Sequence, residues 1–160
     1  MMDRASLISE IQSRPAQTIV CDRILVPIDG SPASMHAVEW AIDLARATDA
    51  ELTILMVIDY DAHISAFEQV SMSGYLPSEL KIAAYRFLAE LMHEIPRSVR
   101  AHTRVEEGDP GEVTVAVAAE EESHLIVMGS RGFGTFERIA FGSVSTYVTH
   151  HAHSPVLLVK

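Results

Sequence analysis

The chain has 160 residues, of which 48% are apolar, and this is enough to bury the core of one domain. Its formal charge of −10 excludes the Lys- and Arg-rich surface that non-specific nucleic-acid binding requires. A single cysteine excludes an intrachain disulfide, and neither a signal-peptide core nor an apolar run of about 18 residues is present. We therefore expect a cytoplasmic protein that has no membrane span and no nucleic-acid partner.

The chain begins with a leader that carries few large aliphatic side chains, residues 1–20, which predicts either a loose tail or one short helix. A buried strand follows at residues 23–29, apolar through its middle and ending in a carboxylate. Ser31 and Pro32 are typical of a helix start, because a capping side chain precedes a first-turn proline. Apolar residues at helical spacing continue this helix to about Thr48.

The rest of the chain keeps the same alternation of strand and helix. Later strands are predicted at residues 52–58, 99–106, 125–128 and 156–159, and later helices at residues 77–95, 110–122 and from 143 onward. Strict alternation implies one parallel sheet with right-handed crossovers. The strand at 99–106 alternates apolar with polar or charged residues, which favours a sheet edge. Residues 59–76 show no period and predict a long loop that serves as a lid or a partner surface.

A group of glycines follows the apolar segment 125–128. Gly129, Gly132 and Gly134 allow a ligand to approach the main chain, because no Cβ stands in the way. A helix is predicted to start after them, with Ser143 as its cap. A helix start presents N–H groups without helical partners and the positive end of the helix dipole, which together suit a phosphate. We therefore predict an anion site between this glycine loop and the start of the last helix.

The spacing of these residues is G-x2-G-x9-G-S, from Gly129 to Ser143, and an apolar strand at 156–159 closes the chain. This pattern resembles the signature of the universal stress protein family, specifically its ATP-binding branch. The resemblance covers residues 22–160 and leaves residues 1–21 outside it as an N-terminal tail. It implies an α/β fold of the adenine nucleotide alpha hydrolase type, Rossmann-like, with an open five-stranded parallel sheet in the order 3-2-1-4-5 and helices on both faces.

The resemblance also implies the residues that bind ATP. The main chain of Val57 would meet the adenine ring, and Asp29, with Pro27 beside it, would help to hold the nucleoside. From the local sequence alone, Asp29 is equally well explained as a residue that caps the turn after it. Arg131 or Arg138 offers a guanidinium to the phosphates, and the Asp29 carboxylate offers a contact to Mg²⁺. The full set of expected cofactor contacts is Pro27, Asp29, Val57, Met128, Gly129, Arg131, Gly132, Gly142, Ser143, Val144 and Ser145.

Two further expectations concern assembly and metal binding. The last strand is wholly apolar although it is expected at a sheet edge, and such an edge invites pairing. We therefore expect a homodimer formed through Val156 to Val159, as the resemblance also implies. Three histidines near a helix end, His150, His151 and His153, are better explained by the helix dipole than by a metal site, since no second cluster of ligands is present.

The expected role is that of a nucleotide-dependent regulator in stress or signalling. In this hypothesis ATP orders the arm of the glycine loop, residues 133–141, and so changes a surface that a partner protein reads. No catalytic residues are assigned, because no acid/base pair dedicated to turnover is recognisable. Two alternatives remain: a slow ATPase or nucleotidyl-transfer enzyme on the same site, and a nucleotide-free dimeric chaperone or scaffold.

Overall fold

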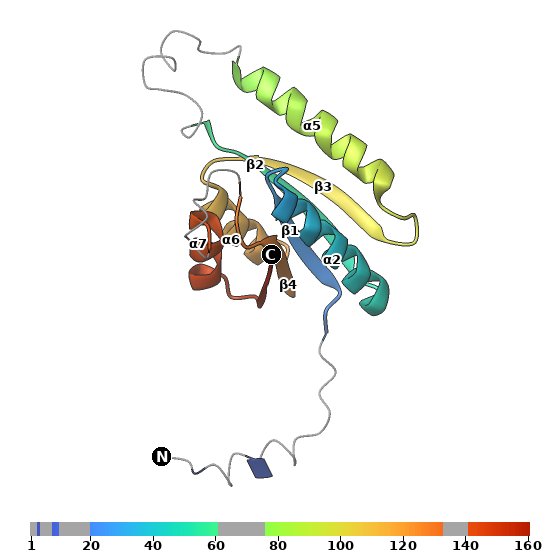
Figure 1. Ribbon diagram of the computed structural model, residues 1–160, viewed down its shortest axis with the longest axis vertical. Coiled ribbons are helices and arrows are strands. Elements are labelled where there is room, and N and C mark those ends of the chain that lie inside the picture. The colour runs from blue at the N-terminus through green and yellow to red at the C-terminus, as the bar shows by residue number, and fades with distance from the viewer. Residues whose placement is uncertain (1–2, 4–7, 10–19, 61–75, 133–140) are drawn as a thin grey trace.

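Five parallel strands form one sheet in the order β3-β2-β1-β4-β5, as predicted (Figure 1). The computed structural model describes residues 3, 8–9, 20–60, 76–132 and 141–160. The strands are β1 (Arg23–Ile28), β2 (Glu51–Ile58), β3 (Arg100–Glu107), β4 (Leu125–Gly129) and β5 (Val156–Val159). The helices are α2 (Pro32–Thr48), α5 (Leu76–Glu94), α6 (Pro110–Glu120) and α7 (Ser143–His151). The ends of these elements differ from the predicted ends by at most two residues.

Helices cover both faces of the sheet, with α2 and α5 on one face and α6 and α7 on the other (Figure 1). Side chains of β1 alternate between the two layers: Ile24 and Val26 pack in the core under α2 and α5, whereas Leu25 packs under α6 and α7. All three side chains are at most 1% exposed. Because both faces of the sheet are covered, successive residues of a central strand must all be apolar, which explains the unbroken apolar run of β1 from Ile24 to Ile28.

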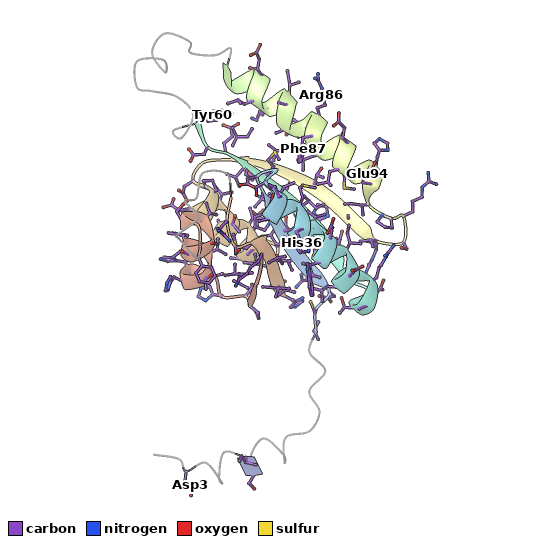
Figure 2. All side chains as sticks on the ribbon, in the orientation of Figure 1. Asp3, His36, Tyr60, Arg86, Phe87 and Glu94 are labelled. Carbon is purple, nitrogen blue, oxygen red and sulfur yellow. The ribbon has the colours of Figure 1, made fainter. Side chains whose placement is uncertain are left out.

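Helix α5 attaches to the sheet through one apolar stripe. Ala84, Leu88 and Leu91 are buried. Phe87 packs partly against the same core on the side of α5 toward the sheet, whereas Arg86 lies exposed on the outer side (Figure 2). The buried residues of α5 therefore recur at helical spacing along one face.

The edge strand β3 is charged, and its arginine pairs with the acidic end of α6. The Arg104 guanidinium lies 2.7 Å from Glu106, 2.8 Å from Glu120 and 3.1 Å from Glu121. Its hydrogen bonds to Glu120 and Glu106 raise the pKa of Arg104 above its ordinary value. Charged side chains make an edge strand a poor template for pairing with another sheet, so this edge is protected in a way that the apolar β5 is not.

Parts of the sequence prediction lie outside the described residues. These parts are most of the leader 1–21, most of the loop 59–76, and most of the arm 133–141 with Gly134 and Arg138. Within the described ranges, no helix combines the length and the apolar character needed to cross a membrane.

Candidate functional site

A cavity of about 290 Å³ lies at the carboxyl edge of the sheet, where β1, β2 and β4 end. Open parallel sheets bind their ligands at this edge, at the point where the strand order reverses. The structure brings the full set of expected cofactor contacts to this cavity: Pro27, Asp29, Val57, Met128, Gly129, Arg131, Gly132, Gly142, Ser143, Val144 and Ser145. Residues that the sequence did not assign to the site also line it: Ile28, Ser34, Leu55, Pro110 and Thr114.

The N-cap of α7 is Gly142, so the prediction that Ser143 caps this helix was wrong by one residue. Gly142 has an extended backbone, with φ −74° and ψ 164°. Its carbonyl accepts the first helical hydrogen bond, from the N–H of Thr146 at 3.0 Å. Ser143 is therefore the first helical residue, and its N–H joins those of Val144 and Ser145 as groups without a carbonyl partner inside the helix.

The starts of α2, α6 and α7 differ in how they are capped. At α2, the Ser31 hydroxyl oxygen accepts the N–H of Ser34 at 3.3 Å. At α6, the Asp109 carboxylate accepts the N–H groups of Gly111 and Glu112, each at 2.9 Å. At α7 the N-cap is a glycine, which has no side chain with which to cap the helix. The first amides of α7 therefore suit an anion in the cavity, with the positive end of the helix dipole behind them.

Two glycines of the motif are required by close contacts inside the protein. A Cβ on Gly129 would lie 2.9 Å from main-chain atoms of Ala33 and Ser34 in the first turn of α2. Gly129 thus allows α2 to pack closely on the end of β4, whereas the role predicted for this glycine from the sequence was ligand approach. A Cβ on Gly132 would collide with the carboxylate of Asp29. Gly132 therefore leaves room for that carboxylate at the cavity wall.

Asp29 follows the end of β1 and is exposed in the cavity wall. Its Oδ1 accepts the N–H of Ser31 at 2.9 Å, so the turn role that the sequence offered as one alternative is confirmed. Asp29 also lines the cavity, which is the position that the alternative role, contact with a ligand, requires. One side chain can serve both roles, because a carboxylate has two oxygens with several acceptor positions.

The carbonyl of Val57 lies beyond the last pair of the β1–β2 ladder. The two strands are in register up to Ile28 and Met56. The carbonyl of Ile58 accepts the N–H of Gly108 at 3.1 Å, which places it on the β3 side. Since the main-chain groups of successive strand residues point to opposite edges, the Val57 carbonyl points to the β1 side, where β1 has already ended. This acceptor at the cavity suits an amino group on a ligand.

The start of α6 forms a wall of the cavity that was not predicted from the sequence. Pro110 and Thr114 line the cavity, and the buried Thr114 hydroxyl donates to the Pro110 carbonyl at 2.6 Å. The sequence could have predicted this wall, because α6 follows β3 and a helix that follows a parallel strand begins at the carboxyl edge of the sheet. Together with Leu55, Val57 and Met128, the start of α6 gives the cavity apolar walls that suit a planar aromatic ring.

Near the end of α7, His151 lies in ordinary helical contacts. The ring of His151 stacks on Tyr147 with centroids 4.0 Å apart. Its Nδ1 lies 2.8 Å from the Tyr147 carbonyl, which accepts its proton. In the part of the chain that the structure describes, no group of three His, Cys, Asp or Glu side chains is arranged to hold a metal ion.

Comparisons of the sequence and of the structure with known proteins indicate the same family. The universal stress protein family matches residues 21–160. A universal stress protein of Methanocaldococcus jannaschii is 32% identical, and the match covers 86% of this chain and 81% of that protein. The solved universal stress protein UspA from Lactobacillus plantarum is 29% identical, with a TM-score of 0.73 over 88% of this chain and 98% of the other. A universal stress protein solved in complex with cAMP is 25% identical, with a TM-score of 0.62 over 87% and 96% of the two chains. This chain therefore belongs to the universal stress protein family.

Proposed function

We propose that this protein binds an adenine nucleotide, with ATP as the principal ligand, and acts as a nucleotide-dependent regulator in the cytoplasm. The observation that carries the proposal is the start of α7, where the amides of Ser143 to Ser145 lie at a cavity wall behind an N-cap that has no side chain. The relative solved with cAMP supports the choice of an adenine nucleotide. Residues 22–160 would form the nucleotide-binding domain and residues 1–21 a tail outside it.

Each part of the nucleotide has a matching part of the cavity. The base would lie between the apolar walls with its amino group toward the Val57 carbonyl, and the ribose would lie near Met128 and Asp29. The phosphates would meet the guanidinium of Arg131 and the main chain of Gly129, Gly132, Gly142, Ser143, Val144 and Ser145. Titration calorimetry with ATP and AMP tests the proposal directly, and a protein that binds neither nucleotide contradicts it.

AMP is expected to bind about tenfold more tightly than IMP. The two nucleotides differ at C6 of the purine, where AMP carries an amino group and IMP an oxygen. The Val57 carbonyl can accept a hydrogen bond from the amino group, whereas it would face the oxygen as a second acceptor and leave both unpaired. Titration of both ligands by calorimetry measures the ratio. Equal affinities would mean that the base does not lie against Val57.

We further propose that Mg²⁺ accompanies ATP. Among the described residues that line the cavity, Arg131 is the one cationic side chain and Asp29 the one carboxylate. The charge of a triphosphate exceeds what one guanidinium neutralises, and a divalent ion bound to the phosphates would reduce it. The Asp29 carboxylate would contribute an oxygen ligand to that ion. ATP titrations in the presence of Mg²⁺ and of a chelator test this part of the proposal.

The site favours binding over turnover. Asp29 is the only Asp, Glu or His among the described residues that line the cavity, so these residues offer no second group to form an acid/base pair with it. Counting the phosphate and the pyrophosphate released for each bound ATP separates a binding protein from a slow ATPase or a nucleotidyl-transfer enzyme. A protein that shows no ATP-dependent shift in melting temperature would instead favour a nucleotide-free chaperone or scaffold.

We also propose that the protein forms a homodimer through β5. The carbonyl of Pro155 accepts the N–H of Ile126, and the carbonyl of Val159 accepts the N–H of Ser130, so these two carbonyls point to β4. By alternation, the main-chain groups of Leu158 point to the outer edge of the sheet. This edge is apolar along β5 and carries no charged side chain from Val156 to Val159, so it suits pairing with a second copy.

Leu158→Pro is expected to convert the dimer to a monomer while leaving the β4–β5 ladder intact. Proline removes an N–H that points outward, and edge strands tolerate that loss in the monomer. Leu158→Ala is the matched control, because it removes the same side-chain packing but keeps the N–H. Sedimentation velocity measures the assembly state. A dimeric Leu158→Pro protein, or a monomeric Leu158→Ala protein, would contradict pairing through the outward main chain of β5.

A further inference from the structure

The hydroxyl of Ser145 is directed into the protein. Ser145 lies in the first turn of α7 and is 2% exposed. Its Oγ lies 2.9 Å from the carbonyl oxygen of Ser130 and 3.0 Å from that of Gly142. A hydroxyl has one proton to donate, so this proton is shared between two main-chain acceptors.

This geometry gives the side chain and the main chain of Ser145 different roles. An ionised phosphate oxygen is a hydrogen-bond acceptor, and the Ser145 hydroxyl has no second proton to give it. Turning the hydroxyl toward a phosphate would remove it from both carbonyls inside the protein. The N–H of Ser145, in contrast, belongs to the first turn of α7 and has no helical partner. The residue can therefore serve the phosphate site through its amide without touching the phosphate with its side chain.

The contact with Ser130 connects α7 to the sheet. The Ser130 carbonyl accepts the Gly142 N–H at 2.9 Å as well as the Ser145 hydroxyl. The Ser130 N–H donates to the Val159 carbonyl at 2.7 Å. Ser130 is 1% exposed and follows β4 directly. These bonds fix the first turn of α7 against the ends of β4 and β5.

We propose that Ser145 is a positioning residue of the nucleotide site. Its hydroxyl holds the start of α7 at Ser130, so that the amides of Ser143, Val144 and Ser145 converge on one phosphate. This inference rests on the proposed function for its effect on binding. The hydrogen bonds that it assigns are present without a ligand, so part of it can be tested without one.

Three variants of the full chain test the proposal. Ser145→Ala removes the hydroxyl, and Ser145→Thr keeps it. Thr149→Ala is the matched control, because the Thr149 hydroxyl donates to the Ser145 carbonyl at 2.6 Å, one turn further along the same helix and without reaching β4. If Ser145→Ala does not fold, Ser145→Cys takes its place, since a thiol fills the space but is a weak donor.

The first readout is amide hydrogen exchange by NMR in the absence of any nucleotide. Ser145→Ala is expected to speed exchange at the Gly142 amide, whose acceptor is the same Ser130 carbonyl. The Ala152 amide, which donates to Val148 at the other end of α7, should keep its rate. The Thr variant and Thr149→Ala should leave the Gly142 rate unchanged. An unchanged Gly142 rate in Ser145→Ala overturns the positioning role.

The second readout is affinity for AMP and for adenosine by calorimetry. Ser145→Ala is expected to weaken AMP binding about fivefold to tenfold and to leave adenosine binding unchanged, because adenosine has no phosphate. Ser145→Thr should recover at least part of the affinity that Ser145→Ala loses, and Thr149→Ala should bind AMP like the wild type. Weaker AMP binding by Ser145→Ala with normal exchange at Gly142 would identify the hydroxyl as a direct phosphate ligand and overturn the proposal. If the wild type binds neither ligand, the proposed function fails, and the exchange experiment alone still decides whether Ser145 positions the helix.

Discussion

Gly129→Ala is expected to lower the free energy of unfolding by about 1–3 kcal/mol. The new Cβ would lie 2.9 Å from the main chain of Ala33 and Ser34, a separation that forces the neighbouring atoms to move. These atoms belong to the first turn of α2, which is held by the cap at Ser31, so they cannot turn aside as a side chain can. The substitution therefore pushes α2 away from the end of β4, and a bulkier residue at this position should cost more.

Urea denaturation of the nucleotide-free protein measures this effect. Gly142→Ser is the matched control, because a Cβ at Gly142 would lie 3.7 Å or more from the atoms of the described residues other than its chain neighbours, and serine is a good N-cap residue. This control should be as stable as the wild type or slightly more stable. If Gly129→Ala unfolds at the same urea concentration as the wild type, the close approach of α2 to β4 does not limit this position.

The fold could be predicted from the sequence because its signals are local. Ser31 with Pro32, and Asp109 with Pro110, mark helix starts through contacts that span only a few residues, and the structure confirms both starts. The strands were recognisable because a parallel sheet covered on both faces needs continuous apolar runs. The strand at 99–106 alternated, and it is the edge strand β3 in the structure. The strand order came from the family resemblance, and the structure has the same order.

The position of the candidate site was predictable for the same reason, whereas its internal contacts were not. Loops that follow parallel strands meet at the carboxyl edge of the sheet, so residues chosen from those loops had to lie close together. The packing of Gly129 against Ala33 depends on a distance between residues that are far apart in the sequence. The direction of the Ser145 hydroxyl depends on where the chain passes at Ser130. Neither contact leaves a pattern that can be recognised along the chain.

The N-cap of α7 shows that even a local prediction can be wrong by one residue. Gly142 and Ser143 are adjacent, and a serine is the better capping residue by its chemistry. The structure nevertheless places the glycine at the N-cap, because its carbonyl meets the N–H of Thr146. A helix start without a capping side chain is weaker by itself, and the amides that it leaves are the basis of the proposed phosphate site.

Gly142→Asp is expected to stabilise the free protein by about 0.5–1 kcal/mol. Gly142 already has the extended backbone of an N-cap residue, with φ −74° and ψ 164°, which any amino acid can adopt. Among the described residues, its chain neighbours aside, the atom nearest to a Cβ there would be the Arg131 Cα, at 3.7 Å. The new carboxylate would accept the amide of Val144 or Ser145 and would lie at the positive end of the helix dipole. Urea denaturation without nucleotide measures the gain.

The same substitution is expected to weaken AMP binding about hundredfold, because the cap and the phosphate need the same amides and carry the same sign of charge. Gly142→Asn separates these two causes, since it occupies the amides without adding a charge and should therefore lose less affinity. Adenosine should bind both variants as it binds the wild type. If Gly142→Asp is stabilised and still binds AMP with full affinity, the phosphate lies elsewhere, because the first amides of α7 cannot bind an internal cap and a ligand together.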